Sequence, residues 1–91
     1  MSLLTPEEIK QALAGTPGWA LDGDSITRTY KFPSFRAALA FVAFVGELAE
    51  DRDHHPDIDV RWAKVSLTLS THSAGGLTEK DFDLAGLIDG G

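Results

Sequence analysis

Residues 57–72 read DIDVRWAKVSLTLSTH, and this stretch decides the fold. Apolar and polar residues alternate along 57–62 and again along 65–72, which is the period of strands with one buried face. Ala63-Lys64 is a candidate turn between the two runs, so together they predict a β-hairpin. One face of this hairpin would be apolar and the other rich in hydroxyl groups. On this phase Trp62 and Thr71 point inward, and we expect both to pack in the core.

A second hairpin is predicted upstream, where Trp19-Ala20-Leu21 and Ile26–Phe32 flank Asp22-Gly23-Asp24. An Asp-Gly pair between two apolar segments is typical of a tight turn. Arg28 interrupts the apolar face of the second strand, so we expect that strand to be half-buried.

Cap residues mark the starts of three predicted helices. They are Thr5 with Glu8 before a helix through about Leu13, Ser34 before a helix over 35 to about 51, and Thr78 with Asp81 before a C-terminal helix. The predicted order is therefore α-β-β-α-β-β-α. Adjacent hairpins favour a two-layer α+β fold, with a four-stranded antiparallel sheet and helices on one face. At 91 residues, the chain has the length of one domain, residues 1–91.

The helix predicted over 35–51 carries apolar residues around much of its circumference. Five of them form one stripe that we expect to face the core: Phe35, Leu39, Val42, Val45 and Leu48. Ala38, Phe41 and Phe44 widen this stripe beyond one ordinary core face. In so short a chain, the second apolar face is expected to meet another copy of the protein.

Composition excludes several classes of protein. The chain has no cysteine, which excludes a disulfide scaffold, a thiolate zinc site and a cysteine nucleophile. Its net charge of −6 argues against a nucleic-acid binder, because phosphate neutralisation needs clustered Lys and Arg. No stretch approaches the roughly 18 apolar residues of a membrane span. With no basic leader at its start, the chain is expected to be cytoplasmic.

All three histidines of the chain fall at one predicted end of the sheet. His54 and His55 precede the third strand, and His72 ends the fourth. Counting from a turn at Ala63-Lys64 places His72 opposite Pro56 and His55. Imidazole exchanges protons near neutral pH, so three converging rings point to acid–base chemistry.

Carboxylates stand near these histidines. Glu50 and Asp53 precede His54 by four and one positions, and a separation of four is about one helical turn. Either carboxylate could therefore orient a ring. Thr71 adjoins His72 in the sequence, and Asp81 lies on the helix that follows.

Each of these residues also has a purely structural explanation. His-His-Pro can simply end a helix, and Glu50 and Asp53 can be solvated charges at that end. Asp81 fits a capping box with Thr78. Three histidines can also bind zinc, but adjacent histidines usually point apart, which disfavours a metal site here.

The segment AEDRDHHPD (49–57), continued by VSLTLSTHSAGGLTEKDFDLAGLID (65–89), closely resembles the pterin-4a-carbinolamine dehydratase family. The family pattern has an acid, three residues, His-His-Pro, an aromatic six after the proline, a His ten further on, and an acid nine beyond. The matching residues here are Glu50, His54-His55-Pro56, Trp62, His72 and Asp81. The likeness is strongest over 49–89 and looser upstream.

This resemblance implies the removal of water from 4a-hydroxytetrahydropterin, giving quinonoid dihydropterin without a metal or redox cofactor. It implies acid–base and pterin-contact roles for His54, His55 and His72. Glu50 and Asp53 would orient these rings or hold the amidine-like edge of the pterin, and the remaining substrate-binding residues, close by, would be Pro56, Thr71 and Asp81. Family members form dimers or tetramers, here expected through helix 35–51 and the sheet edges. Two alternatives stay open: a binding module such as the family's transcriptional dimerisation cofactors, and a role with molybdopterin-related compounds. No direct contact with nucleic acid or membrane is expected.

Overall fold

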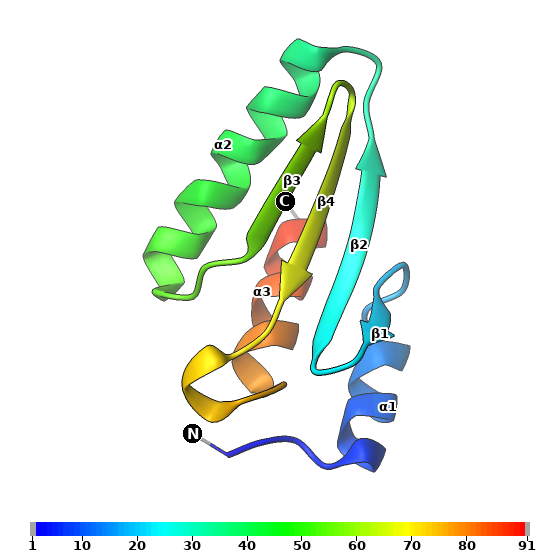
Figure 1. Cartoon of the computed structure of the whole chain (residues 1–91), viewed down its shortest axis with the longest axis vertical. Coiled ribbons are helices and arrows are strands. Elements are labelled where there is room, and N and C mark those ends of the chain that lie inside the picture. The colour runs from blue at the N-terminus through cyan, green and yellow to red at the C-terminus, as the bar shows by residue number, and fades with distance from the viewer. Residues whose placement is uncertain (1, 91) are drawn as a thin grey trace.

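The chain folds into an antiparallel sheet covered on one face by α-helices, as Figure 1 shows for the computed structural model, which describes residues 2–90. In chain order the elements are α1 (Pro6–Ala14), β1 (Ala20–Asp22), β2 (Ser25–Lys31), α2 (Phe35–Arg52), β3 (Asp57–Arg61), β4 (Lys64–Leu69), the short 3₁₀ turn η1 (His72–Ala74) and α3 (Glu79–Gly90). The four strands lie in the order β1-β2-β4-β3. Within residues 2–90, no helix has both the length and the apolar composition needed to cross a membrane.

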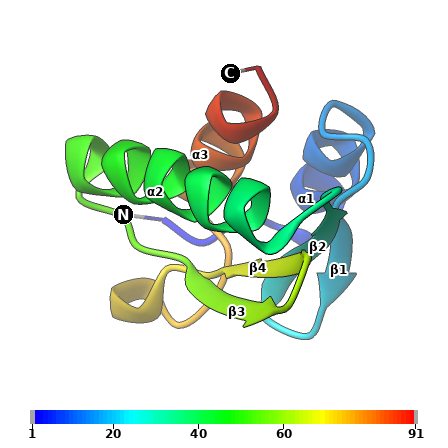
Figure 2. The same ribbon diagram turned by 90° about the horizontal axis from the view of Figure 1, so that it is seen from above.

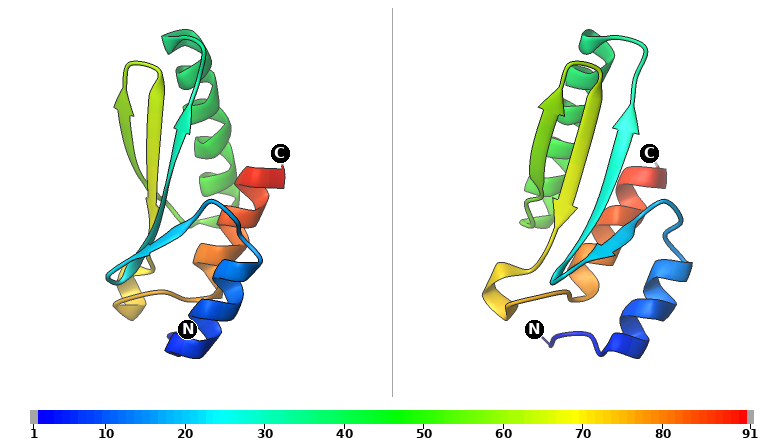
Figure 3. Two further views of the ribbon diagram at one scale, coloured as in Figure 1. Left: turned by 90° about the vertical axis from the view of Figure 1, so that its right-hand side faces the viewer. Right: turned by 45° about the vertical axis from the view of Figure 1, so that its right-hand side comes forward.

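The two predicted layers are confirmed. Figure 2 shows α1, α2 and α3 on the same side of the sheet, and Figure 3 shows this layering from two further directions. All three strand pairings are antiparallel. The other face of the sheet is left without a covering helix, and it carries the hydroxyl pairs Thr27–Thr68 and Thr29–Ser66 of β2 and β4.

The predicted caps form the hydrogen bonds that define them. Thr5 Oγ1 accepts from the Glu8 backbone N–H at 3.2 Å, and Glu8 Oε1 accepts from the Thr5 N–H at 2.8 Å. Ser34 Oγ accepts from the Ala37 N–H at 3.1 Å at the start of α2. Gly23, in the tight turn between β1 and β2, has a φ of 60°, a conformation that glycine adopts without steric cost. Local sequence therefore determines where these elements begin.

The turn between β3 and β4 lies at Trp62-Ala63, one residue earlier than predicted. Arg61 pairs with Lys64 across it, and Trp62 has a positive φ of 53° and is 76% exposed. The prediction that Trp62 packs in the core is therefore wrong. The strand ends at Arg61, so the inward and outward alternation does not extend to the next residue.

The earlier turn also changes the register at the far end of the hairpin. Asp57 pairs with Thr68, and β4 ends at the following residue. The prediction that His72 lies in register with Pro56 and His55 is therefore wrong. His72 lies beyond the end of the ladder, where it begins η1.

The core lies between the sheet and the helices. Its buried side chains come from both hairpins and from α2 and α3: Trp19, Ile26, Ala38, Val45, Val65, Leu67, Leu69, Leu77, Leu84, Ala85 and Ile88. Thr71 is buried beside them at 4% exposure, which confirms its predicted inward position. A buried branched side chain contributes about 1.5–3 kcal/mol, so this cluster holds the helices against the sheet.

Helix α2 faces the core with only part of the predicted stripe: Val45 is buried, and Val42 and Leu48 pack against the core. Phe35 is 48% exposed and Leu39 is 46% exposed, so the expectation that they pack in the core is wrong. The fully buried positions of the helix are Ala38, Val45 and Ala49. The two alanines allow the helix backbone to approach its neighbours closely. Phe41, Val42 and Leu48 are partly buried against the core, whereas Phe35, Leu39 and Phe44 are exposed.

Asp89 joins the end of α3 to the first hairpin. Its carboxylate accepts hydrogen bonds from Trp19 Nε1 at 2.9 Å, Arg28 Nη1 at 3.1 Å and the Tyr30 hydroxyl at 2.5 Å. Burial, together with the hydrogen bond to Asp89 and its charge, raises the pKa of Tyr30 well above its usual value, although the Arg28 charge opposes this shift. Arg28 thus has a partner on the helical side of the sheet, and β2 is half-buried as predicted.

Candidate active site

A shallow hollow lies where α2 ends, β4 ends and α3 begins. Its volume is about 330 Å³, and all three histidines line it. The complete lining is Asp53, His54, His55, Ser70, Thr71, His72, Ser73 and Lys80. Residues from three separate parts of the sequence therefore meet at one end of the sheet.

The end of α2 gives the two adjacent histidines opposite surroundings. Asp53 follows the helix in the left-handed conformation, with a φ of 48°, which Asp tolerates better than most residues. The His54 N–H donates back to the Ala49 carbonyl at 3.0 Å, so the chain reverses tightly. After this reversal, His54 is buried at 8% exposure, and His55 is exposed.

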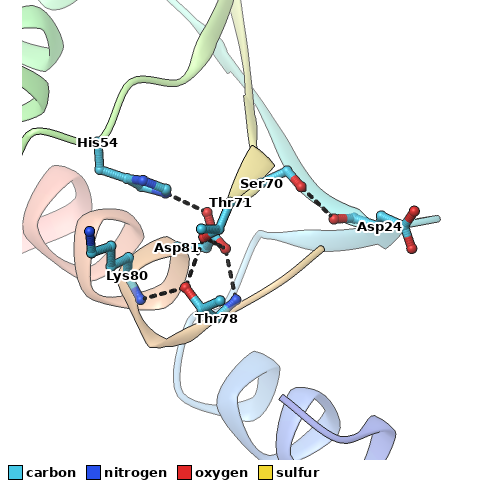
Figure 4. A network of polar contacts seen from close by, with 7 residues as sticks. All are labelled: Asp24, His54, Ser70, Thr71, Thr78, Lys80 and Asp81. Carbon is cyan, nitrogen blue, oxygen red and sulfur yellow. Dashed lines mark hydrogen bonds and ion pairs between the residues drawn. The ribbon is translucent and has the colours of Figure 1, made fainter. Parts of the chain in front are cut away.

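His54 forms a buried pair with Asp81. Its Nε2 lies 2.6 Å from Asp81 Oδ1, and the two side chains are 9% and 0% exposed (Figure 4). An ionised carboxylate can only accept hydrogen bonds. With Asp81 ionised, Nε2 therefore carries a proton. In the neutral ring, Nδ1 is then the nitrogen without a proton. Asp81 fixes both the orientation and the tautomer of His54.

A directed chain of hydrogen bonds holds Asp81 in turn (Figure 4). Its second oxygen, Oδ2, accepts from Thr71 Oγ1 at 2.8 Å and from the Thr78 N–H at 2.9 Å. Because the Thr71 proton is used there, the Thr78 hydroxyl donates to Thr71 Oγ1, at 2.8 Å. The Lys80 N–H then donates to Thr78 Oγ1 at 3.3 Å. Among residues 2–90, no buried side-chain polar atom lacks a partner.

His55 forms a second, exposed carboxylate pair. Its Nε2 lies 2.5 Å from Glu50 Oε2, and the side chains are 56% and 75% exposed. Exposed pairs of this kind contribute about 0–1 kcal/mol to stability. The pair orients an imidazole at the rim of the hollow and adds little to the fold.

His72 enters the hollow from the other side. It begins η1, which is closed by Gly75 at a φ of 78° and by a bridge between Thr71 and Gly76. The His72 side chain is exposed and makes no side-chain hydrogen bond to the other described residues. Its ring nitrogens are therefore left available to a bound molecule.

The predicted site residues take different positions around the hollow. Five of them line it directly: Asp53, His54, His55, Thr71 and His72. Glu50 and Asp81 are not part of the lining, but each is paired with a histidine that is. Pro56 is half-buried and is not part of the lining. Within residues 2–90, no group of three His, Asp or Glu side chains is arranged to hold a metal ion.

Sequence reasoning missed three lining residues. Ser70, Ser73 and Lys80 belong to the hollow. Ser70 stands on the outward face predicted for β4, and the corrected register brings this end of the strand beside the histidines. The alternation of β4 already placed Ser70 on the outward face. Its position beside the histidines could be predicted only with the correct location of the turn.

Comparison with known proteins identifies the family. Residues 2–90 match the sequence profile described as Pterin 4 alpha carbinolamine dehydratase. The chain belongs to this family. A protein of Roseiflexus castenholzii, named "Putative pterin-4-alpha-carbinolamine dehydratase", is 56% identical over 88 residues, covering 97% of this chain and 95% of its own.

Solved structures agree with this assignment. A Brucella melitensis protein titled transcriptional coactivator/pterin dehydratase has a TM-score of 0.92 at 39% identity, covering 97% of this chain and 96% of its own. A pterin dehydratase-like protein described as a RuBisCO assembly factor in the alpha-carboxysome has a TM-score of 0.64 at 22% identity. The likeness covers 79% of this chain and 83% of that protein. At that identity, the second likeness extends to the fold alone.

Proposed function

We propose that this protein dehydrates 4a-hydroxytetrahydropterin, with the hollow lined by three histidines as its active site. The observation that carries the proposal is the presence of two carboxylate-oriented imidazoles, His54 and His55, around the same hollow as the unpaired His72. Membership of the dehydratase family supports this choice of substrate.

The reaction needs two proton transfers and nothing else. The C4a–O bond breaks as a proton is delivered to the departing hydroxyl, which leaves as water. A base removes the proton from N5, and the C4a=N5 double bond forms. Imidazolium serves as the acid and neutral imidazole as the base near neutral pH, and each transfer is worth about 10²–10⁴-fold in rate. Three rings around one hollow can supply both groups.

The carboxylates divide into two roles in this proposal. Asp81 is fully buried and both its oxygens are engaged, so we assign it a positioning role instead of the pterin contact expected from the sequence. Thr71 shares that role because its hydroxyl binds Asp81. Asp53 is exposed in the lining of the hollow. Its carboxylate is suited to accept hydrogen bonds from the amidine-like edge of a pterin.

We expect His55→Ala and His72→Ala each to lower the dehydration rate constant at least about tenfold while leaving the fold intact, because each ring is exposed and gives up a proton-transfer group. Stopped-flow absorbance of the carbinolamine, generated in situ by a hydroxylase, measures its decay with and without the protein. Asp59→Ala, on the open face of the sheet, is the control and should keep the wild-type rate. Wild-type rates in both folded histidine variants would overturn the proposal.

We also propose that copies of the chain associate through the face of α2 that carries Phe35 and Leu39. These two side chains are 48% and 46% exposed, and large exposed apolar side chains that share one helix face are typical of an interface. A protein partner is the alternative occupant of this face, since the Brucella relative is described as a transcriptional coactivator as well as a pterin dehydratase. Self-association needs no further component, so we propose a second copy of the chain as the occupant of this face.

A charge on this face should separate the copies. We expect the wild type to sediment as a dimer or tetramer and Leu39→Glu to sediment near the 9.8 kDa of one chain, because burying an unpaired carboxylate is costly. Lys10→Glu, which places a glutamate on exposed α1, is the matched control and should keep the wild-type mass. Analytical ultracentrifugation decides, and a monomeric wild type at micromolar concentration would contradict self-association.

A further inference from the structure

A second hollow adjoins the histidine hollow. Its volume is about 210 Å³, and it lies between the end of α2 and the start of α3. Its lining is Arg52, His54, Lys80, Asp83 and Leu84. His54 and Lys80 line both hollows. A molecule bound at the histidines can therefore extend past His54 into the second hollow.

Two basic side chains border this extension. Arg52 ends α2, and Lys80 lies in the first turn of α3; both are exposed. In the part of the chain from 2 to 90, neither takes part in an ion pair. Figure 4 shows the Lys80 side chain extending from α3 on the side where His54 lies. The acid of this lining is Asp83, so the two cations outnumber it.

The reacting pterin ring does not account for the positive charges of Arg52 and Lys80. The pterin ring is uncharged near neutral pH, and the dehydration described above needs only the imidazoles. The chain as a whole carries a net charge of −6, whereas the lining of the second hollow has two cations and one carboxylate. Lysine and arginine bind phosphate and carboxylate through charge-assisted hydrogen bonds, which are about twice as strong as neutral ones.

We propose that the site selects pterins whose ring substituent ends in an anionic group, phosphate or carboxylate, and that Arg52 and Lys80 bind this group in the second hollow. The inference rests on the proposed function, because it places the pterin ring among the histidines. It makes Arg52 and Lys80 specificity residues, which distinguish one pterin from another and take no part in the proton transfers.

Equilibrium binding tests this inference with two pterins that differ in one group. Titration calorimetry compares 7,8-dihydroneopterin with its 3′-monophosphate, and 7,8-dihydrofolate serves as the carboxylate arm. We expect the phosphate to bind about tenfold more tightly than its neutral parent, the effect of one good charge-assisted contact. This preference should shrink as salt is raised, because the two cations are exposed. A preference for dihydrofolate over the monophosphate would identify carboxylate as the group.

Variants assign the preference to its residues. In Lys80→Gln and Arg52→Gln, the affinity ratio of the phosphate to the neutral pterin should fall about threefold or more each. In Asp83→Asn the ratio should rise, because the competing negative charge is removed. Arg36→Gln, in the first turn of α2 and far from both hollows, is the matched control and should leave the ratio unchanged.

The outcomes separate the inference from the function beneath it. Equal affinity for the phosphate and its neutral parent overturns the anionic preference and leaves the dehydratase proposal standing. A preference that survives unchanged in both cation variants overturns the assignment to Arg52 and Lys80. Failure of every pterin to bind the folded wild type overturns the proposed function itself.

Discussion

Asp81→Asn should fold and yet lose at least about a hundredfold of the dehydration rate. The amide oxygen can still accept from Thr71 and Thr78, as Oδ2 does now at 2.8 and 2.9 Å. The amide nitrogen then faces His54 Nε2, and it can only donate. His54 must accept there and move its proton to Nδ1, which is the opposite tautomer. Replacing the orienting Asp of a serine protease triad by Asn has this consequence and costs about 10⁴-fold.

Two measurements separate this effect from simple damage to the fold. Stopped-flow decay of the carbinolamine gives the rate, and nitrogen-15 chemical shifts of His54 report which ring nitrogen carries the proton. Glu79→Gln makes the same acid-to-amide change in the first turn of α3 and should keep both the rate and the tautomer. An Asp81→Asn protein that retains the wild-type rate would show that Asp81 does not position a reacting group.

The elements of this fold were predictable because their signals are local. A capping side chain such as Thr5 or Ser34 binds a backbone group three residues away. Strand alternation along β4 needs only the sequence of that strand. Three histidines near one end of the sheet also followed from element order, since two of them precede β3 and one follows β4. Their meeting in one hollow does not depend on the exact register.

The wrong predictions concern residues for which two local signals disagree, or for which a distant part of the chain determines burial. Trp62 has the size of a core residue and the right phase for one, but the chain turns at this position. Helix α2 has apolar residues on two faces, and its own sequence does not say which face meets the sheet. The buried face proved to be the one with Ala38 and Ala49, because small residues permit close packing.

The second hollow could not be predicted from the sequence at all. Arg52 and Lys80 lie 28 positions apart, and each by itself is an ordinary surface charge. Only the packing of α2 against α3 brings them to the same hollow beside His54. Asp81 is a related case, because its capping pattern was visible while its contact with His54, 27 positions away, was not.

Asp89→Ala should lower the free energy of unfolding by about 3 kcal/mol. The carboxylate accepts from Trp19, Arg28 and Tyr30, which come from three positions in and before the first hairpin. Trp19 is only 6% exposed, so the loss of the partner of its indole N–H costs about 1–3 kcal/mol. The Arg28 pair is about a quarter to a third exposed and adds less. Urea unfolding measures the change, and Asp83→Ala, exposed on the same helix, is the control and should change stability little.

The same variant should also change how stability depends on alkaline pH. Burial first, and Asp89 second, hold the pKa of Tyr30 above its usual value of 10.0 in the folded chain. A group whose folded pKa is raised contributes stability that is fully present below its unfolded pKa. This contribution is lost as the pH rises from about 10 toward the folded pKa. Tyr30 is the one tyrosine in the sequence, so the absorbance of tyrosinate reports it alone. In Asp89→Ala the titration should move to lower pH but stay above 10, because burial remains. An unchanged titration would mean that Asp89 neither holds the Tyr30 proton nor stabilises the folded chain through it.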